Sequence, residues 1–444
     1  MKKQVLFLMS LVLGGHASVC AAAPPTPLNP GKALDAINMT LVHDVVAPPV
    51  AARYYAYTTL GAYAIVSTHN KSLPAPTRFI TGYTTDLRLD TVKGKYDYQI
   101  AAYYSMLESA RLLLPSGENL AGEEEEFVRG LEKQGVKPAV LAQSVRVGKL
   151  AAKAAVAFSK ADRYNRLSAL KRYTPLKAEG AWYPTPPAYI EAVEPNWKTI
   201  RPLMIDSAAQ FRPAPMVPFS KDTTSAFHKQ VVAVYNVAKH LTDEQLQIAQ
   251  FWDCNPFAVN TSGHMSIGFK KISPGGHWMN IGALVAQQKK VGFDRTVLVL
   301  AMEGITLMDA FISCWEAKYA TNRIRPETYI NRFIDVKWQP LLQTPPFPEY
   351  TSGHAVVSNA VAEMLTYLLG DNIAYLDNTE IPFGSGERAF TSFRQAAGEA
   401  SVSRFYGGIH YMESVNNGNE QGRQIGRYLV TKLRNAGVKP LASR

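Results

Sequence analysis

Apolar residues recur at helical spacing along the first part of the chain. Segments 33–68, 96–114 and 123–164 carry apolar side chains three and four positions apart, the pattern of amphipathic helices. The first segment is interrupted at Pro48–Pro49, and the third is interrupted between Gly135 and Pro138. Proline and glycine at these points indicate breaks between separate helices.

Helical periodicity resumes after residue 220. Thr242 and Gln245 form the sequence pattern of a capping box, which predicts a short helix running to Trp252. Gly437 is the expected stop of the last helix. The other periodic segments are 225–240, 279–291, 294–319, 354–369, 392–406 and 419–435. Alternation typical of strands is almost absent, so the pattern predicts an all-α protein of roughly ten helices.

Residues 165–220 differ from the helical segments on either side. Nine prolines fall between Pro175 and Pro218, and tryptophan, tyrosine and phenylalanine are interleaved with them. Proline at this density excludes regular helix, while the aromatic side chains indicate packing against other elements. We expect an irregular connection between an N-terminal helical region, residues 23–220, and a C-terminal helical catalytic domain, residues 221–436.

The N-terminus has the pattern of a secretory signal peptide covering residues 1–22. Two lysines precede the apolar stretch Val5–Leu13, and small residues follow it. The stretch is too short to span a bilayer. Cys20 suggests a lipoprotein, but residues 17–19 lack the leucine expected three positions before an acylated cysteine. Simple cleavage and export, to the periplasm or outside the cell, is therefore the preferred interpretation.

Composition narrows the function classes further. Apolar residues are 47% of the chain and the formal net charge is +11, so a sizeable core and an anionic ligand are both expected. The basic residues are scattered and form no Lys/Arg run, so nucleic-acid binding is not expected. Segment Val297–Ile312 is apolar but contains Glu303 and Asp309, so we predict a buried helix and no transmembrane span. Cys254 and Cys314 are interpreted as small buried side chains rather than a disulfide.

Candidate chemistry is concentrated in three short stretches. In the first, Lys318 and Arg325 are seven residues apart, which places both on one face of a continuous helix, and Pro326 should end that helix. By itself this stretch is also typical of a solvated basic helix end. The second stretch, Thr351–His354, precedes a strong helical pattern, so its amides should form a helix N-terminus that favours anions.

The third stretch contains Ser403, Arg404, Gly408 and His410. The glycines should end the helix that carries Arg404 and let His410 turn back toward the same place. A lone arginine or histidine here is usually a surface or structural residue. Together, however, the three stretches offer three cations, a hydroxyl, a glycine amide and two imidazoles, the groups that a tetrahedral oxyanion requires.

These motifs resemble the signature shared by type 2 phosphatidic acid phosphatases, bacterial acid phosphatases and vanadium-dependent haloperoxidases. The resemblance covers roughly residues 300–420, and the long helical chain is similar to the haloperoxidase branch. Trp315 and Phe347 stand at offsets found in fungal-type chloroperoxidases, and they are halide or pocket candidates. The resemblance implies two packed helical bundles, joined here by the Pro-rich irregular connection, with the anion site in the C-terminal one.

For a haloperoxidase, the resemblance implies a vanadate cofactor, with peroxide and halide as small-molecule substrates. His410 would be the axial vanadium ligand and His354 the acid–base residue. The residues that would hold the oxyanion are Lys318, Arg325, Ser352, Gly353 and Arg404. The alternative is an acid phosphatase without a cofactor, in which His410 attacks a phosphate ester and His354 protonates the leaving alcohol. A third interpretation is an exported phosphate-binding protein without turnover, and the oligomeric state is left open.

One position departs from the phosphatase pattern. Many of these phosphatases have an aspartate four residues after the last histidine, where this chain has Ser414. The group that orients His410 is therefore left open among Glu413, Asp309, another carboxylate and a backbone carbonyl. Two further histidines, His264 and His277, show no metal-ligand spacing and are interpreted as structural or pocket-lining.

Overall fold

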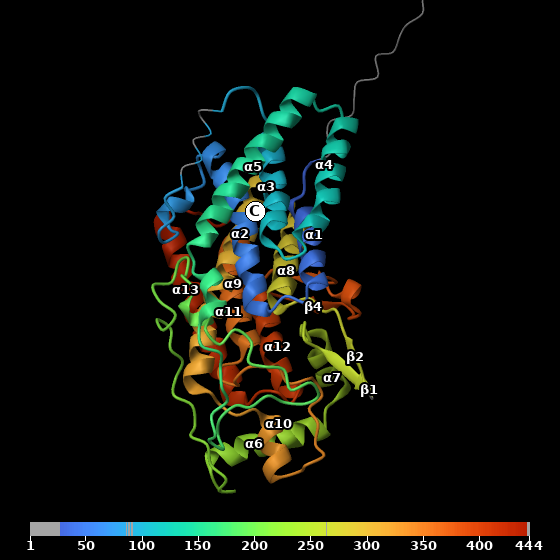
Figure 1. Cartoon of the computed structure of the whole chain (residues 1–444), viewed down its shortest axis with the longest axis vertical. Helices are drawn as coiled ribbons and strands as arrows, with labels where there is room; N and C mark the ends of the chain where they lie inside the picture. Colours follow the sequence, from blue (N-terminus) through green and yellow to red (C-terminus); the bar gives the residue numbers. More distant parts are fainter. Residues whose placement is uncertain (1–26, 86, 88, 90–91, 263, 442–444) are drawn as a thin grey trace, which may run out of the picture.

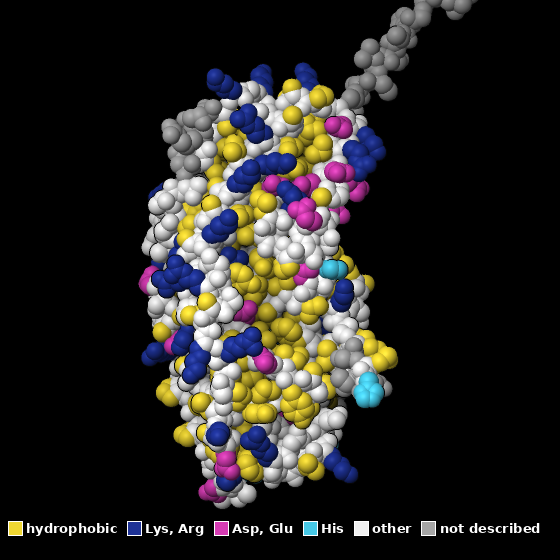
Figure 2. Space-filling view, in the orientation of Figure 1, with side chains coloured by type: hydrophobic (Ala, Val, Ile, Leu, Met, Phe, Trp, Pro, Cys, Tyr) yellow, Lys and Arg dark blue, Asp and Glu magenta, His cyan; other side chains and the backbone are white. Residues whose placement is uncertain are grey.

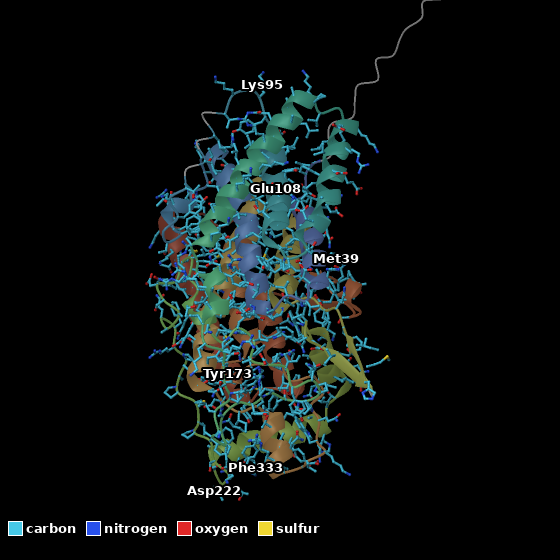
Figure 3. All side chains as sticks on the ribbon, viewed as in Figure 1. Met39, Lys95, Glu108, Tyr173, Asp222 and Phe333 are labelled. Carbon is cyan, nitrogen blue, oxygen red and sulfur yellow. The ribbon has the colours of Figure 1, made fainter. Side chains whose placement is uncertain are left out.

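The computed structural model describes residues 27–441 except 86, 88, 90, 91 and 263. The molecule is elongated, and Lys95 and Asp222 lie at opposite ends of its long axis (Figure 3). Helices α4 and α5 lie toward one end, and α6 and α10 lie at the other (Figure 1). The described part of the chain is mostly helical, with two small sheets, which confirms the predicted all-α class.

The N-terminal helices follow the predicted segments closely. They are α1 (Pro30–His43), α2 (Pro48–His69), α3 (Tyr98–Leu113), α4 (Ala121–Lys133) and α5 (Pro138–Lys160). Prolines stand at the first positions of α2 and α5, where their missing N–H has no intrahelical partner to lose. The predicted breaks at Pro48–Pro49 and before Pro138 are therefore helix starts.

The C-terminal helices carry the three stretches of candidate chemistry. They are α6 (Ala226–Lys239), α7 (Asp243–Phe251), α8 (Pro274–Gln288), α9 (Phe293–Thr321), α10 (Pro326–Phe333), α11 (Gly353–Leu369), α12 (Phe393–Tyr406) and α13 (Met412–Ala436). The capping box of Thr242 with Gln245 and the left-handed stop at Gly437 are both present. Helices α8 and α13 both begin earlier than predicted. Ser273 caps α8 and Pro274 opens it, which accounts for the earlier start of that helix.

The strands in the described part of the chain form two short antiparallel hairpins. Strands β1 (Val259–Ser262) and β2 (Met265–Gly268) form one, and β3 (Tyr375–Asp377) and β4 (Arg388–Phe390) form the other. Each strand has three or four residues, too few for the alternation of a strand to stand out in the sequence.

Helix α9 is the central element of the molecule. It packs against α2, α8, α11 and α13, and its apolar side chains belong to the main core. By length and composition α9 is the described helix that could cross a membrane, but its apolar stretch lies entirely inside the protein. This agrees with the buried helix predicted for Val297–Ile312.

The Pro-rich segment is irregular, as predicted, and lies along the outside of the helices (Figure 1). It contains short 3₁₀ turns at Tyr164–Ala169 and Trp197–Thr199, and Trp182 and Trp197 are fully buried. Asp309 on α9 fixes the segment, because its carboxylate accepts the backbone N–H groups of residues 203–205 at 2.7–2.9 Å.

The main core contains residues from both sides of position 220, from Ala33 to Val438. The domain boundary at that position remains a prediction. The predicted signal peptide, including Cys20, lies outside the described residues. Figure 2 shows Lys and Arg side chains spread over one face with acidic side chains among them, consistent with the scattered basic residues of the sequence. Cys254 and Cys314 are buried and free, which confirms the prediction against a disulfide.

A stripe of glycines brings α13 against α11. Gly418, Gly422 and Gly426 are four residues apart, so they lie on one face of the helix. A Cβ atom at Gly422 would stand 2.2 Å from the carbonyl oxygen of Val356, and one at Gly426 would stand 2.6 Å from that of Ala360. The absence of side chains at these positions therefore sets the distance between the two helices.

Gly422→Ala should destabilise the protein by about 1–3 kcal/mol, because the added methyl group forces two backbones apart. Gly130→Ala is the matched control: it lies in α4, and its Cβ would meet no atom within 4 Å. The control should be neutral or stabilising by about 0.5–1 kcal/mol, since alanine favours helix over glycine. Chemical unfolding measures both. Equal effects of the two variants would contradict this account of the packing.

Candidate active site

Six of the predicted residues line one cavity, and Lys318, Arg325 and Ser352 are buried but do not line it. Its polar wall consists of Arg404, His354, His410 and the backbone of Gly353. The remaining wall is largely apolar. It is lined by Pro48, Cys254, Asn255, Pro256, Phe257, Pro274, Phe311, Trp315, Pro345 and Phe347.

Lys318 enters the site from the last turn of α9. Its Nζ donates to the carbonyl oxygens of Pro348, Glu349 and Thr351 at 3.0, 3.1 and 2.5 Å. The side chain is fully buried. Lys318 therefore fixes the loop that leads into α11, and its charge lies beside the α11 N-terminus.

Arg325 lies on the connection between α9 and α10, which corrects one sequence prediction. Helix α9 ends at Thr321, and Pro326 opens α10 instead of ending α9. Asn322 takes a left-handed backbone conformation at the end of α9, and backbone bonds to residues 180 and 182 hold the connection. Arg325 then donates from Nε to the Phe347 carbonyl at 3.0 Å and from Nη1 to the Ile409 carbonyl at 2.8 Å.

The turn before α11 provides the backbone part of the site. Ser352 is the N-cap, with its hydroxyl 3.5 Å from the Ala355 amide; it is buried and is not part of the cavity wall. Gly353 and His354 follow and line the cavity. A Cβ at Gly353 would come within 4.0 Å of both Trp315 and Lys318, so the glycine leaves room for a ligand beside the lysine.

Arg404 reaches the cavity from the last turn of α12 and donates to the Trp252 carbonyl at 2.9 Å. Gly408 follows α12 with a φ of 78°, a conformation that favours glycine, and its pro-Cβ position faces Pro340 and Trp338. The chain thus reverses and brings His410 to the same cavity as Arg404, as the glycine pair predicted.

His410 has a defined tautomer. Its Nδ1 lies 2.8 Å from Glu349 Oε1, and its Nε2 lies 3.1 Å from Arg325 Nη1. A guanidinium can only donate, so Nε2 must be the acceptor and Nδ1 must carry the hydrogen. The ring is therefore neutral and presents a lone pair on Nε2 toward the cations of the site.

Glu349 is the residue that orients His410, and sequence reasoning missed it. Its Oε1 also accepts the Tyr411 amide at 3.1 Å, and its Oε2 lies 3.5 Å from Arg323. The candidates Glu413 and Asp309 have other partners: Glu413 pairs with Arg323 at 2.7 Å, and Asp309 binds the Pro-rich segment. Glu349 stands 61 residues before His410, so no local spacing pointed to it.

Burial dominates the electrostatics of the site. It lowers the pKa of Lys318 to about 7 and that of Arg325 to about 10. It also lowers the pKa of Arg404. The pKa values of both His354 and His410 lie well below their ordinary range, because the rings are buried and surrounded by cations. Burial raises the pKa of Glu349, while Arg323, Arg325 and Lys318 oppose that rise.

An aromatic pair in the cavity wall lies beside the cations. The rings of Trp315 and Phe347 are 4.9 Å apart. The Phe347 ring lies 5.1 Å from Lys318 Nζ and 5.2 Å from Arg325 Cζ, within the range of cation–π contacts. Both aromatic candidates therefore line the cavity and contact its cations.

The unpaired polar atoms of the site suit an oxyanion. Among the described residues, Arg325 Nη2 and His354 Nε2 are buried without a hydrogen-bond partner. A buried donor without an acceptor costs free energy, and an anion with several oxygens would pair with Arg325 Nη2 while offsetting the positive charge. The donor set, with the Nε2 lone pair of His410 beside it, therefore fits vanadate or phosphate.

Comparison with known proteins agrees with this geometry. The family model described as the VCPO second helical-bundle domain matches residues 331–436. The structure of the first bacterial vanadium-dependent iodoperoxidase is similar with a TM-score of 0.85 and 38% sequence identity, over 92% of this chain and 97% of that chain. No curated protein sequence matches.

Two chloroperoxidase structures share the fold at lower identity. The apo form of a bacterial vanadium-dependent chloroperoxidase has a TM-score of 0.66 and 15% identity, over 88% of this chain and 95% of that chain. A holo form has a TM-score of 0.62 and 15% identity, over 94% of this chain and 95% of that chain.

Affinity for an oxyanion should fall as pH rises through about 7. Lys318 loses its charge there in the free protein, and a bound anion favours the charged form, so binding above the pKa requires proton uptake. The fall should approach about tenfold per pH unit above the pKa. Calorimetric titration with tungstate, whose own charge is constant near neutral pH, measures it. Lys318→Arg should flatten the dependence, since arginine stays charged, and an equal slope in both proteins would contradict the assignment.

Proposed function

Because the chain belongs to the vanadium-dependent haloperoxidase superfamily, we propose that it uses vanadate and hydrogen peroxide to oxidise halide, with iodide as the halide. The observation that carries the proposal is the position of His410, which lines the same cavity as His354 and Arg404 and whose Nε2 lone pair faces Arg325. The overall reaction converts peroxide, iodide and a proton into hypoiodous acid and water. The peroxide O–O bond breaks, and iodide loses two electrons.

The chain's own residues bind and orient the oxyanion. Arg325 and Arg404 would hold its oxygens, with Ser352 and the Gly353 amide at the α11 N-terminus. Lys318, whose Nζ donates to three carbonyls, would add its positive charge beside them. Vanadate, when bound through Nε2 of His410, supplies the Lewis acidity that activates peroxide. The positive charges of the site favour developing negative charge on oxygen, and burial strengthens that effect.

The two histidines have different roles in this proposal. Glu349 holds the Nδ1 hydrogen of His410, which keeps Nε2 available as a ligand atom. His354 has a buried, unpaired Nε2 and a lowered pKa, so its ring is neutral at neutral pH and can accept a proton from an incoming peroxide.

Support for iodide comes from the relatives. The 38% identical structure, similar over nearly its whole length, is described as an iodoperoxidase. The two structures described as chloroperoxidases are 15% identical and support the fold alone.

We also propose that the protein is exported after cleavage of residues 1–22. The proposal rests on the two lysines, the apolar stretch Val5–Leu13 and the small residues that follow it. A mature protein without these residues would meet its substrates in the periplasm or outside the cell.

The activity is tested with purified protein freed of oxyanions. Vanadate, peroxide and iodide together should produce triiodide, and omission of vanadate or peroxide should abolish it. His410→Ala should lose both stable vanadate binding and iodide oxidation. Hydrolysis of p-nitrophenyl phosphate without any halide oxidation would instead select the phosphatase alternative. Tight phosphate binding with neither reaction would select the non-catalytic one.

Glu349→Gln tests the orientation of His410. Removing the charge that holds Nδ1–H should weaken vanadate binding by about 10–100-fold, as for other partners that orient metal-ligating histidines. Glu413→Gln is the matched control, because that carboxylate contacts Arg323 and not His410. The control should lose less than about tenfold. Similar losses in both variants would remove Glu349 from this role.

Export is tested by N-terminal sequencing of the protein from cell fractions. The mature chain should begin at about residue 23, the end of the predicted signal peptide, and should be found outside the cytoplasm. An intact N-terminus in the cytoplasmic fraction would contradict the proposal.

A further inference from the structure

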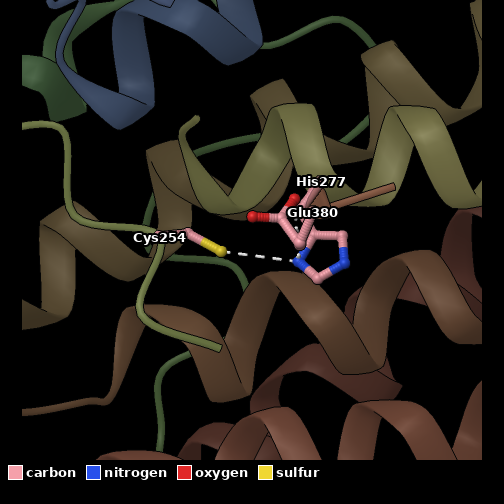
Figure 4. A group of neighbouring side chains, drawn as sticks. All are labelled: Cys254, His277 and Glu380. Atoms are coloured by element: carbon pink, nitrogen blue, oxygen red, sulfur yellow. Dashed lines mark hydrogen bonds and ion pairs between the residues drawn. The ribbon is translucent and has the colours of Figure 1, made fainter. Parts of the chain in front are cut away.

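A second cluster of ligand-type side chains lies beside the anion cavity. Cys254 follows α7, His277 belongs to α8, and Glu380 follows β3 (Figure 4). All three are buried, and one potential ligand atom from each lies within 4.8 Å of the other two. The haloperoxidase chemistry proposed above does not use them.

The distances suit a tetrahedral metal ion. Cys254 Sγ lies 3.4 Å from His277 Nδ1, and Nδ1 lies 3.6 Å from Glu380 Oε1. Zinc bonds of about 2.3 Å to sulfur and about 2.0 Å to nitrogen and oxygen place sulfur and nitrogen about 3.5 Å apart at the tetrahedral angle, and nitrogen and oxygen about 3.3 Å apart. The two observed distances from Nδ1 are close to these values, and Cys254 Sγ lies within 4.8 Å of a Glu380 carboxylate oxygen.

Asp377 prepares His277 for such a role. Its Oδ2 lies 2.9 Å from His277 Nε2, on the side of the ring opposite Cys254. A carboxylate that accepts the hydrogen on one ring nitrogen leaves the lone pair on the other, which is the arrangement found behind many metal-ligating histidines. Trp252 stacks on the ring with centroids 4.6 Å apart and fixes its plane.

Glu380 has a buried carboxylate oxygen without a hydrogen-bond partner in the described part of the chain, which favours a bound cation. Its side chain is 4% exposed, and its Oε1 has no hydrogen-bond partner among the described residues. Burial raises the pKa of Glu380 to about 7, while His277 and Lys271 oppose the rise. A divalent cation would pair this oxygen and favour the charged carboxylate.

We propose that Cys254, His277 and Glu380 bind one zinc-class divalent ion, with Asp377 positioning His277. Thiolate, imidazole and carboxylate together are ligands that zinc accepts, and three protein ligands leave its fourth position open. The ion would join the loop after α7, the start of α8 and the β3–β4 connection. Cys254 also lines the anion cavity, so the ion would brace one wall of that cavity.

Cobalt(II) is a suitable probe, because thiolate ligation gives it a charge-transfer band in the near ultraviolet. Chelator-treated mature protein, without vanadate, should bind one equivalent of cobalt chloride with that band, and zinc chloride should displace it. Elemental analysis checks the stoichiometry. Since no oxyanion or peroxide is present, the result is independent of the haloperoxidase proposal.

Variants assign the ligands. Cys254→Ser should lose the band, while the control Cys314→Ser, which removes the other buried cysteine, should keep it. Glu380→Gln should keep the band with at least about tenfold weaker affinity, and Asp377→Asn should weaken binding by about 10–100-fold. Thermal unfolding verifies that each variant is folded. If Cys254→Ser does not fold, the affinity of Glu380→Gln for cobalt still tests the proposal.

The alternative is a metal-free ion pair. Burial alone would lower the pKa of His277. The neighbouring Glu380, Asp377 and Cys254 outweigh burial and raise this pKa well above its ordinary value, so a buried imidazolium is the competing state. Nitrogen-15 NMR of His277 distinguishes the two states. A ring protonated on both nitrogens that does not respond to zinc chloride would overturn the proposal. A cobalt complex without a thiolate band, or one that keeps the band in Cys254→Ser, would overturn it as well.

Discussion

The buried carboxylate of Glu349 is the constraint on which the arrangement of the site depends. The carboxylate accepts hydrogen bonds from the ring of His410 and the backbone amide of Tyr411. Lys318 donates to the backbone carbonyl of the same glutamate. One residue therefore ties the end of α9, the loop before α11 and the turn after α12. Because it fixes the tautomer of His410, it also decides which nitrogen faces the cavity.

The helical frame makes this arrangement rigid. Helix α9 is buried along its apolar stretch and carries Lys318 at its last turn. The glycine stripe of α13 sets the position of α11, whose first residues line the cavity. Charged side chains held out of water in this way are costly, and the cost is offset only where polar partners surround them. A rigid, buried site with positively charged side chains therefore suits an anion of fixed shape.

Local spacing in the sequence was sufficient for the fold class and most helices. The site residues were identified from the combined chemistry of three short motifs and from their resemblance to a known family. Helical periodicity marks α9 and α11, and glycines mark the turn after α12. Tertiary partners were not predictable in this way. Glu349 orients His410 from 61 positions away, and Asp377 contacts His277 across 100 positions. Pro326 was misjudged because proline suits the first turn of a new helix as well as the end of an old one.

The composition of the cavity wall has a consequence for selectivity. Most of the lining is carbon: proline rings, phenylalanine and tryptophan. An ion that passes such a wall must shed part of its hydration shell, and the cost of dehydration falls as ionic radius grows. Small, strongly hydrated chloride would meet a higher barrier than large, polarisable iodide. If the protein oxidises halides as proposed, this apolar wall would favour halides that hold water weakly over those that hold it firmly.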